Sequence, residues 1–326
     1  MKIRIIGVPS AWGTLELGAQ RTPGLLRDAG LAAWLAAAGH EVDDGGDVSV
    51  PAQDDNDLRH AEQNPASSTV QVAAMARAVR AAVTASLRDG YLPLLLGGEC
   101  SLSIGAVPAL AQHNAPVTVA WLDAHGDLNT PETSSSGLLT GMPLAVVLGE
   151  GPAELTAVGS DVARPATGAT FLIGGRDLDP GEVTNMERFG VRHVDTAAAR
   201  SDGPEEVAMQ VLGVPEIAVI PPEARAQLVA GDAAAAAAVD AAPRPNLYLH
   251  FDVDVLDPDY APGVHYRVDG GFDPAEVGTL AGYLCASGCV SAIAVASANL
   301  DHDTDGRTIA AIRDVFSSIA DALATL

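Results

Sequence analysis

Residues 91–125 read YLPLLLGGECSLSIGAVPALAQHNAPVTVAWLDAH, and this stretch decides the fold class. Two apolar runs, over residues 91–98 and 117–125, flank a segment with the Ala and Leu pattern of a helix at residues 102–112. Strands that are apolar along their whole length and are joined by helices are typical of a parallel sheet with helices on both faces. The stretch therefore predicts an α/β protein.

The same alternation extends toward both ends of the chain. A helix over residues 22–40 is expected, because Thr22 and Pro23 form a start signal and Gly39 a stop signal. Further strands are predicted at residues 1–8, 170–176, 246–254 and 290–297, and a further helix at residues 69–88.

Composition excludes several classes of function. The chain has 326 residues, 48% of them hydrophobic, so it can bury a large core and is not expected to be disordered. Its 18 Lys and Arg against 42 Asp and Glu give a net charge of −24, which repels phosphate backbones and anionic lipid headgroups. We therefore expect neither a nucleic-acid nor a membrane partner.

The cysteines and the first residues predict the compartment. Cys100, Cys285 and Cys289 cannot all pair, the chain opens without a secretory pattern, and no run approaches 18 apolar residues. A reducing cytoplasm is expected. Cys285 and Cys289 are expected in the core, on a helix just before a strand.

Polar residues that can carry chemistry follow the predicted strands. Residues i and i+2 of an extended segment point the same way, so Asp123 and His125 can aim at one point, as can Asp252 and Asp254. With Asp127, these carboxylates would crowd one cleft, which like charges do not do without a cation. A divalent metal site is the simplest explanation, and Mn²⁺ suits oxygen and imidazole ligands. Alternatively, each motif only caps a following helix.

The motif order resembles that of the arginase/agmatinase (ureohydrolase) family over nearly the whole chain. The resemblance rests on GVPSAWGTLELGAQRTPGLLRDAGL (7–31), LLLGGECSLSIG (94–105), WLDAHGDLNTPETSSSGLLTGMP (121–143), IGGRDLDPGE (173–182), LHFDVDVLDPDYAPG (249–263) and ANLDHDTDGRT (298–308). It implies a three-layer α/β/α fold with a mainly parallel eight-stranded sheet, in a single domain over residues 1–326. Surface insertions are expected at residues 149–168 and 221–245.

The resemblance also implies a metal centre and an assembly. Two Mn²⁺ ions would activate a bridging hydroxide for attack on a guanidinium carbon, and the chain would form a homo-oligomer, a trimer or a hexamer. By position, the second ion would be held by Asp123, His125, Asp252 and Asp254. The first would be held by Asp123, Asp127, Asp252 and a histidine of the family's GGDHS motif.

That histidine is absent, because residues 97–101 read GGECS and place Cys100 at the ligand position. A thiolate binds metals but favours Zn²⁺ or Fe²⁺ over Mn²⁺. Cys100 is therefore either a ligand or a small buried residue in a vacated position.

Two further positions depart from the family. Thr140 replaces a histidine assigned to proton transfer or substrate contact, and a hydroxyl does not shuttle protons as imidazole does. Ser297 replaces the Glu that pairs with the guanidinium, although Asp301 or Asp303 could supply a carboxylate if the loop is shifted. Asp127, Thr140 and Ser297 are the candidate catalytic residues, and a modified guanidinium becomes a candidate head group.

The predicted substrate end keeps more of the family pattern. Asn129 and Ser136 match positions that receive the α-carboxylate of arginine, and Asp179 matches the one that faces its α-amino group. Alternatively, the three residues serve only turns. An amino-acid substrate is favoured.

The leading hypothesis is metal-dependent hydrolysis of a C–N bond in a guanidino or modified guanidino amino acid, of the arginine or N-hydroxyarginine type. The products would be urea, or a urea derivative, and an amine. One alternative is a mononuclear zinc amidase, since zinc deacetylases share this fold. The other is a catalytically impaired relative kept for binding or assembly.

Overall fold

A single parallel sheet forms the centre of the protein. The computed structural model describes residues 1–213 and 245–326, and within these ranges eight strands pair in the order β2-β1-β3-β8-β7-β4-β5-β6, all parallel. This confirms the predicted α/β class and the eight-stranded sheet. The strands are β1 (Lys2–Val8), β2 (Glu41–Asp47), β3 (Leu92–Gly97), β4 (Val117–Leu122), β5 (Thr170–Ile173), β6 (Arg192–Val194), β7 (Asn246–Asp252) and β8 (Val290–Ala296).

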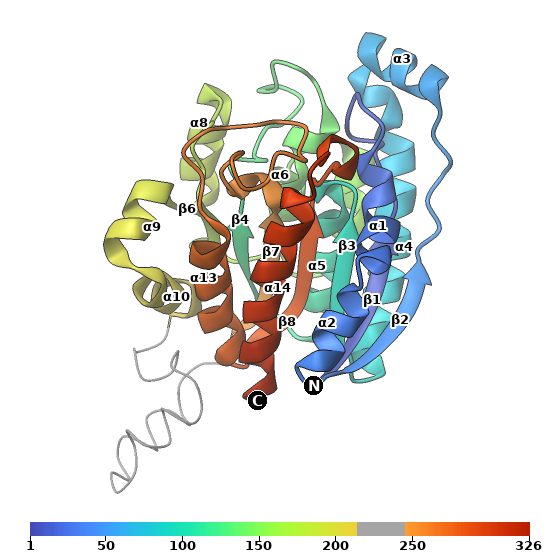
Figure 1. Ribbon diagram of the computed structural model, residues 1–326. Helices are drawn as coiled ribbons and strands as arrows, with labels where there is room; N and C mark the ends of the chain where they lie inside the picture. The colour runs from blue at the N-terminus through green and yellow to red at the C-terminus, as the bar shows by residue number, and fades with distance from the viewer. Residues whose placement is uncertain (214–244) are drawn as a thin grey trace, which may run out of the picture.

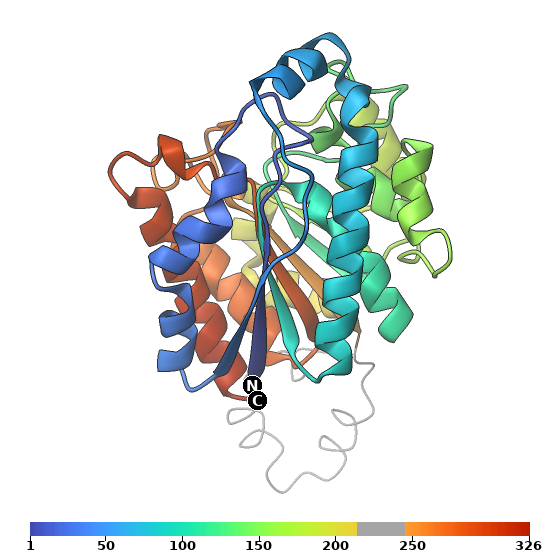
Figure 2. The same cartoon turned by 90° about the vertical axis from the view of Figure 1, so that its right-hand side faces the viewer.

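Helices cover both faces of the sheet, which gives the three layers that Figures 1 and 2 show. One apolar cluster joins the sheet to α1 (Thr22–Asp28), α2 (Leu31–Ala37), α9 (Thr196–Asp202), α10 (Pro204–Leu212), α13 (Pro274–Ala286) and α14 (Arg307–Ala324). The second joins it to α4 (Thr69–Arg88), α5 (Ser103–His113), α6 (Pro143–Leu148), α7 (Ala153–Thr156) and α8 (Pro180–Phe189). The remaining α-helix of the described ranges is α3 (Asp55–Gln63).

The apolar pattern of the sequence misses the two edge strands. It predicts the six inner strands, whose residues are largely buried. In contrast, β2 has the sequence EVDDGGD with no buried residue, and β6 has one buried residue out of three. An edge strand pairs on one side only and contacts solvent, so it does not need a continuous apolar run.

The helix predicted over residues 22–40 is in fact two helices. Its start at Thr22 is confirmed, but α1 ends at Asp28 and α2 begins at Leu31. Gly30 between them has a φ of 96°, a left-handed conformation that interrupts the helical hydrogen bonds. The helix predicted at residues 69–88 matches α4, and α5 lies within one residue of its predicted bounds.

The structure describes the first of the two predicted insertions and buries both cysteines that were expected in the core. Residues 149–168 contain α7, which packs against α4 and buries Leu155. The second predicted insertion, residues 221–245, lies outside the described residues except for Pro245. Cys285 is buried in the last turn of α13, while Cys289 is buried just past its end, immediately before β8.

The two chain ends lie close together at the amino-terminal end of the sheet (Figures 1 and 2). The loops that follow the strands therefore gather at the opposite end, away from both termini. Among the described residues, no helix is both long enough and apolar enough to cross a membrane.

Candidate active site

All the predicted site residues line one cavity at the carboxyl end of the sheet. Its volume is about 270 Å³, slightly below the about 300–1,000 Å³ of pockets that hold drug-sized ligands, so it suits a small metabolite. The predicted residues that line it are Cys100, Asp123, His125, Asp127, Asn129, Ser136, Thr140, Asp179, Asp252, Asp254 and Ser297.

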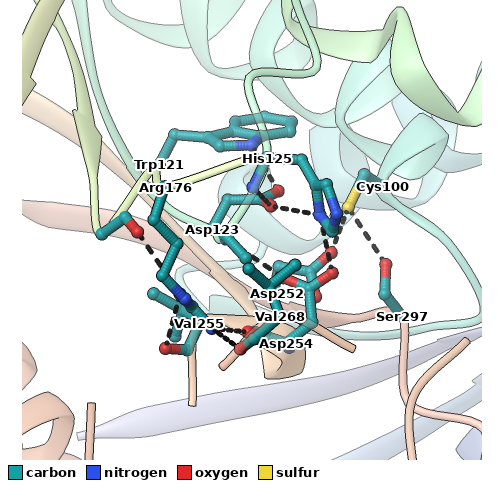
Figure 3. A network of polar contacts seen from close by, with 12 residues as sticks. Cys100, Trp121, Asp123, His125, Arg176, Asp252, Asp254, Val255, Val268 and Ser297 are labelled. Carbon is teal, nitrogen blue, oxygen red and sulfur yellow. Dashed lines mark hydrogen bonds and ion pairs between the residues drawn. The ribbon is translucent and has the colours of Figure 1, made fainter. Parts of the chain in front are cut away.

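Cys100 points at the predicted metal position. It begins a short 3₁₀ helix, η3 (Cys100–Leu102), with two residues between it and the end of β3. Its Sγ lies 2.8 Å from Asp252 Oδ2 and 3.2 Å from Ser297 Oγ (Figure 3). Burial, with the nearby charges of Asp252 and Asp127, raises the pKa of the Cys100 thiol well above its usual value. Without a cation the sulfur is therefore protonated and donates to Asp252.

Asp123 lies between two groups of candidate ligands just after β4. The Trp121 Nε1–H donates to its Oδ2 at 2.9 Å, and the backbone N–H of His125 donates to its Oδ1 at 2.7 Å. The His125 Nδ1 is 3.0 Å from Asp254 Oδ2 and 3.6 Å from Asp123 Oδ1. Tryptophan and backbone donors thus fix the Asp123 carboxylate in one orientation.

Asp252 and Asp254 converge, but not because the backbone stays extended. Asp252 is the last residue of β7, and Asp254 lies in the 3₁₀ turn η7 (Val253–Val255), which corrects the simple i, i+2 expectation. The Asp252 Oδ1 accepts the Asp254 N–H at 2.8 Å, and the Asp254 Oδ1 accepts the Ala124 N–H at 3.1 Å. These bonds turn the chain so that both carboxylates still face the cavity.

Burial and mutual repulsion make the carboxylates costly to ionise. Burial, with repulsion from Asp254, raises the pKa of Asp123 to about 7. It also raises the pKa of Asp127 and of Asp252 above their usual values. Burial acts against the charged form of His125, but its ion pairs with Asp254 and Asp123 prevail and raise its pKa to about 12. For Asp254 the His125 ion pair likewise outweighs burial and lowers the pKa.

The residues present fit a divalent transition metal. Ligand atoms of Asp123, His125 and Asp254 lie within 4.8 Å of one another. So do those of Cys100, Asp123, His250 and Asp252, while one buried oxygen of Asp127, Oδ2, has no hydrogen-bond partner. Carboxylates with imidazole and sulfur suit Mn²⁺, Fe²⁺ or Zn²⁺ better than Mg²⁺ or Ca²⁺, which prefer oxygen alone.

Arg176 stabilises the turn after β7 and a later loop through hydrogen bonds to their backbone carbonyls. Its guanidinium donates to the backbone carbonyls of Asp254 at 2.9 Å and Val268 at 2.8 Å, and also to that of Val255 (Figure 3). Carbonyl acceptors satisfy the half-buried guanidinium without neutralising its charge. Arg176 therefore holds the turn after β7 rather than taking part in the cavity itself.

A second group of polar residues forms the other end of the cavity. The Asn129 side-chain N–H donates to Asp179 Oδ2 at 3.0 Å. Glu182 accepts the backbone N–H of Leu128 at 3.1 Å and that of Asp179 at 3.0 Å, so it ties the loop after β4 to the start of α8. Ser136 lies on the same rim, where its Oγ accepts the Leu138 N–H at 3.2 Å.

The three family departures all face the cavity, but no shifted carboxylate replaces the missing Glu. Ser297 contacts the Cys100 sulfur, and Thr140 lines the wall. Asp301 instead pairs with Arg21, and both Asp303 oxygens accept backbone N–H groups at the start of α14. Neither lines the cavity, so the expectation of a compensating carboxylate in this loop is wrong.

The backbone is strained at two of the predicted residues. Among the described residues, Asp127 with φ of 51° and Ser297 with φ of 62° are the non-glycine residues in the positive-φ region. Such conformations are unfavourable for residues with a side chain and concentrate at functional sites.

Sequence reasoning misses several residues of this site. Glu99, Glu182, His265 and Tyr266 also line the cavity. His250 lies beneath it on β7, with Nε2 3.2 Å from the Cys100 sulfur. A signal for His250 was present, because it stands two residues before Asp252 in a strand and so shares its side. No comparable pattern marks His265 or Tyr266, which lie in a loop.

Comparisons with known proteins agree with this geometry. The arginase family model matches residues 1–219 and 222–320. An arginase of Staphylococcus aureus (strain MRSA252) is 35% identical over 274 residues, covering 84% of this chain and 82% of that protein. The crystal structure of arginase from Bacillus subtilis matches with a TM-score of 0.80 and 27% identity over 98% of both chains. The proclavaminate amidino hydrolase of Streptomyces clavuligerus shares the fold, with a TM-score of 0.67 and 20% identity over 99% of this chain and 92% of that one.

Proposed function

This chain belongs to the arginase family, and from that premise we propose that it hydrolyses a C–N bond in a guanidino or modified guanidino amino acid. The products would be urea, or a urea derivative, and an amine. One observation carries the proposal: a single cavity has candidate metal ligands at one end and the Asn129, Ser136 and Asp179 group at the other.

At the metal end, the chain supplies ligands for one or two divalent ions. Asp123, His125, Asp252 and Asp254 would hold one ion, and Cys100 with Asp127 would contribute to the other. Mn²⁺ is the ion that the family resemblance favours, and Zn²⁺ or Fe²⁺ suits the sulfur. Bound ions lower the pKa of a water molecule and polarise the bond to be cleaved.

At the other end, polar groups orient the amino-acid part of the substrate. The amide of Asn129 and the hydroxyl of Ser136 can donate to a carboxylate. Asp179 can accept from an ammonium group, and its hydrogen bond to Asn129 holds both side chains in place. Fixed orientation of this kind brings the reacting carbon to the metal end and contributes to the rate.

Two residues that line the cavity, Thr140 and Ser297, differ from what a plain guanidinium would need. Ser297 offers a hydroxyl where the family has a carboxylate, so the charge of the head group is less strongly bound there. Thr140 stands where the family has a histidine, and its hydroxyl does not transfer protons as imidazole does. Of the described residues that line the cavity, His265 is the histidine other than His125, and its Nε2 is buried without a hydrogen-bond partner. We assign it proton transfer or head-group contact.

The departures favour a specialised substrate within the family over arginine itself. The Staphylococcus aureus relative is named an arginase, and the Streptomyces clavuligerus neighbour is named for proclavaminate, so one fold serves more than one substrate. N-hydroxyarginine fits the proposal, because its head group carries an oxygen and is less basic than a guanidinium.

The proposal includes a homo-oligomer, a trimer or a hexamer. Light scattering of the purified protein tests this oligomeric state.

A substrate panel tests the proposed function. Metal-free protein is loaded with Mn²⁺ or Zn²⁺ and given arginine, N-hydroxyarginine, agmatine and an acetylated lysine peptide. Release of urea or hydroxyurea from the amino acids, and less from agmatine, is the expected result. Turnover of the peptide with one zinc per chain would favour the amidase alternative. Silence with every compound, in protein shown to hold metal, would support the impaired relative instead.

A further inference from the structure

We infer that His250 on β7 is a metal ligand and takes the role of the histidine that Cys100 replaces after β3. Its site would comprise Cys100, Asp123, His250 and Asp252. The inference rests on the metal requirement of the proposed function and not on the substrate.

The His250 ring lies beside the Cys100 sulfur. Its Nε2 is 3.2 Å from the Cys100 sulfur, and Cys100 is in turn 2.8 Å from Asp252 Oδ2. Two ligands of one tetrahedral site, with metal bonds of about 2.0–2.3 Å, lie about 3.5 Å apart. The ligand atoms of all four residues lie within 4.8 Å of one another, so small movements would bring them around one ion.

Trp121 orients the His250 ring. The His250 side chain is fully buried and stacks on Trp121, with ring centroids 3.7 Å apart and planes at 16°. The same Trp121 donates to Asp123, and residues 121 and 250 are paired partners on the adjacent strands β4 and β7. One tryptophan therefore positions two of the four ligands.

The other ring nitrogen of His250, Nδ1, faces two hydroxyl groups. Nδ1 lies 3.2 Å from Ser103 Oγ and 3.4 Å from Tyr248 OH, and these two hydroxyls are 2.7 Å apart. Metal-binding histidines generally donate their second N–H to such a partner, which selects the tautomer and leaves the opposite lone pair free. Here that lone pair belongs to Nε2, on the side of Cys100 and Asp252.

The four residues of the proposed site offer three kinds of ligand atom. One thiolate, one imidazole and two carboxylates make a mixed sulfur, nitrogen and oxygen site that favours Zn²⁺ or Fe²⁺ over Mn²⁺. The other half of the cavity, with Asp254 and His125, contains no sulfur. The two halves should therefore differ in metal preference.

Zinc titration of the full-length, EDTA-treated protein tests the inference without any activity measurement. The variant His250→Phe keeps an aromatic ring against Trp121 but has no nitrogen. This variant should bind one zinc equivalent where the wild-type protein binds two, or bind one of the two at least about 100-fold more weakly. Such a loss of affinity is larger than is typical of substitutions at residues that are not metal ligands. The matched control is His40→Phe, another buried histidine, which bonds the Ala320 carbonyl and should keep both equivalents.

Diffraction from zinc-loaded wild-type crystals decides the case even if His250→Phe does not fold. The expected anomalous peak lies about 2.0–2.1 Å from His250 Nε2. A peak only beside His125 and Asp254, or unchanged zinc binding in a folded His250→Phe protein, would overturn the inference and leave the proposed function standing. Absence of bound zinc or manganese in the wild-type protein would remove the metal basis of both.

Discussion

At the residue scale, the proposed function gives the two ends of the cavity separate roles, and matched substitutions can tell them apart. Asp252 lies at the metal end, beside the Cys100 sulfur and the turn that holds Asp254. Asp179 lies at the other end, bonded to Asn129. Both are aspartates, so the same isosteric change can be made at each.

We predict that Asp252→Asn loses bound metal and nearly all activity, because a neutral amide is a poor ligand for a divalent ion. Asp179→Asn should keep the metal and show mainly a higher KM, by about 10-fold or more, because it loses a charge-assisted hydrogen bond to the substrate. Metal analysis and steady-state kinetics of both variants check the prediction. Full metal occupancy in Asp252→Asn would contradict it.

Cys100 should set the metal preference. The variant Cys100→Ser replaces a sulfur ligand by a harder oxygen, so zinc affinity should fall relative to manganese affinity by about 10-fold or more. In cobalt-loaded protein, the sulfur-to-metal charge-transfer absorption should disappear. Cys285→Ser, at a buried cysteine in α13 outside the cavity, is the control and should keep both properties. If the absorption is absent from the wild-type protein as well, Cys100 is not a ligand.

At the scale of the element, a single glycine divides the first predicted helix. Gly30 has a φ of 96° between α1 and α2, whereas Gly24 lies inside α1, has no positive φ and has open space where a β-carbon would be. A β-carbon added at Gly30 meets no atom closer than 3.5 Å, so the backbone conformation and not a clash would set the cost.

Alanine substitutions at these two glycines should therefore have opposite effects on the free energy of unfolding. Gly30→Ala should lower the free energy of unfolding by about 1–2 kcal/mol, because L-residues disfavour the left-handed region. Gly24→Ala should raise it by up to about 1 kcal/mol, because alanine is the better helix former and restricts the unfolded chain. Denaturant unfolding measures both, and equal effects of the same sign would refute the conformational argument.

At the scale of the whole molecule, the charge at the carboxyl end of the sheet couples stability to pH and metal. Burial raises the pKa of Asp123 to about 7 in the folded protein, against about 3.9 in an unfolded chain. The stability that this group contributes is fully present below about pH 4 and is lost as the pH rises toward 7. Above that pH, the metal-free cavity holds ionised carboxylates close together.

Added Zn²⁺ or Mn²⁺ should therefore raise the melting temperature more at pH 8 than at pH 5, since the ligands must be deprotonated. A concentration of 100 times the dissociation constant corresponds to about 2.7 kcal/mol of stabilisation. The difference between loaded and metal-free protein at each pH isolates the site from other titrating groups. The same gain at both pH values, or no gain at either, would contradict the coupling.

Much of this protein can be predicted from the chain alone, because local patterns report burial and strand ends. The inner strands are continuous apolar runs. Asp123 and His125 follow one of them, and Asp252 ends another, with Asp254 just beyond it. The carboxyl ends of adjacent parallel strands lie at the same edge of a sheet, so these four residues are expected to lie close together. The predicted residues at the substrate end also line the same cavity for this reason.

Only the tertiary structure determined the features that depend on contacts between distant segments of the chain. The edge strands β2 and β6 carry no apolar run and exist through pairing with β1 and β5. Asp301 and Asp303 are held away from the cavity by Arg21 and by the start of α14. Similarly, His250 reads as a buried strand residue until the pairing of β4 with β7 places Trp121 against it and the end of β3 places Cys100 beside its ring. Sequence patterns report which residues are buried and where strands end, but the partner of a buried polar atom depends on which strands pair and in what register.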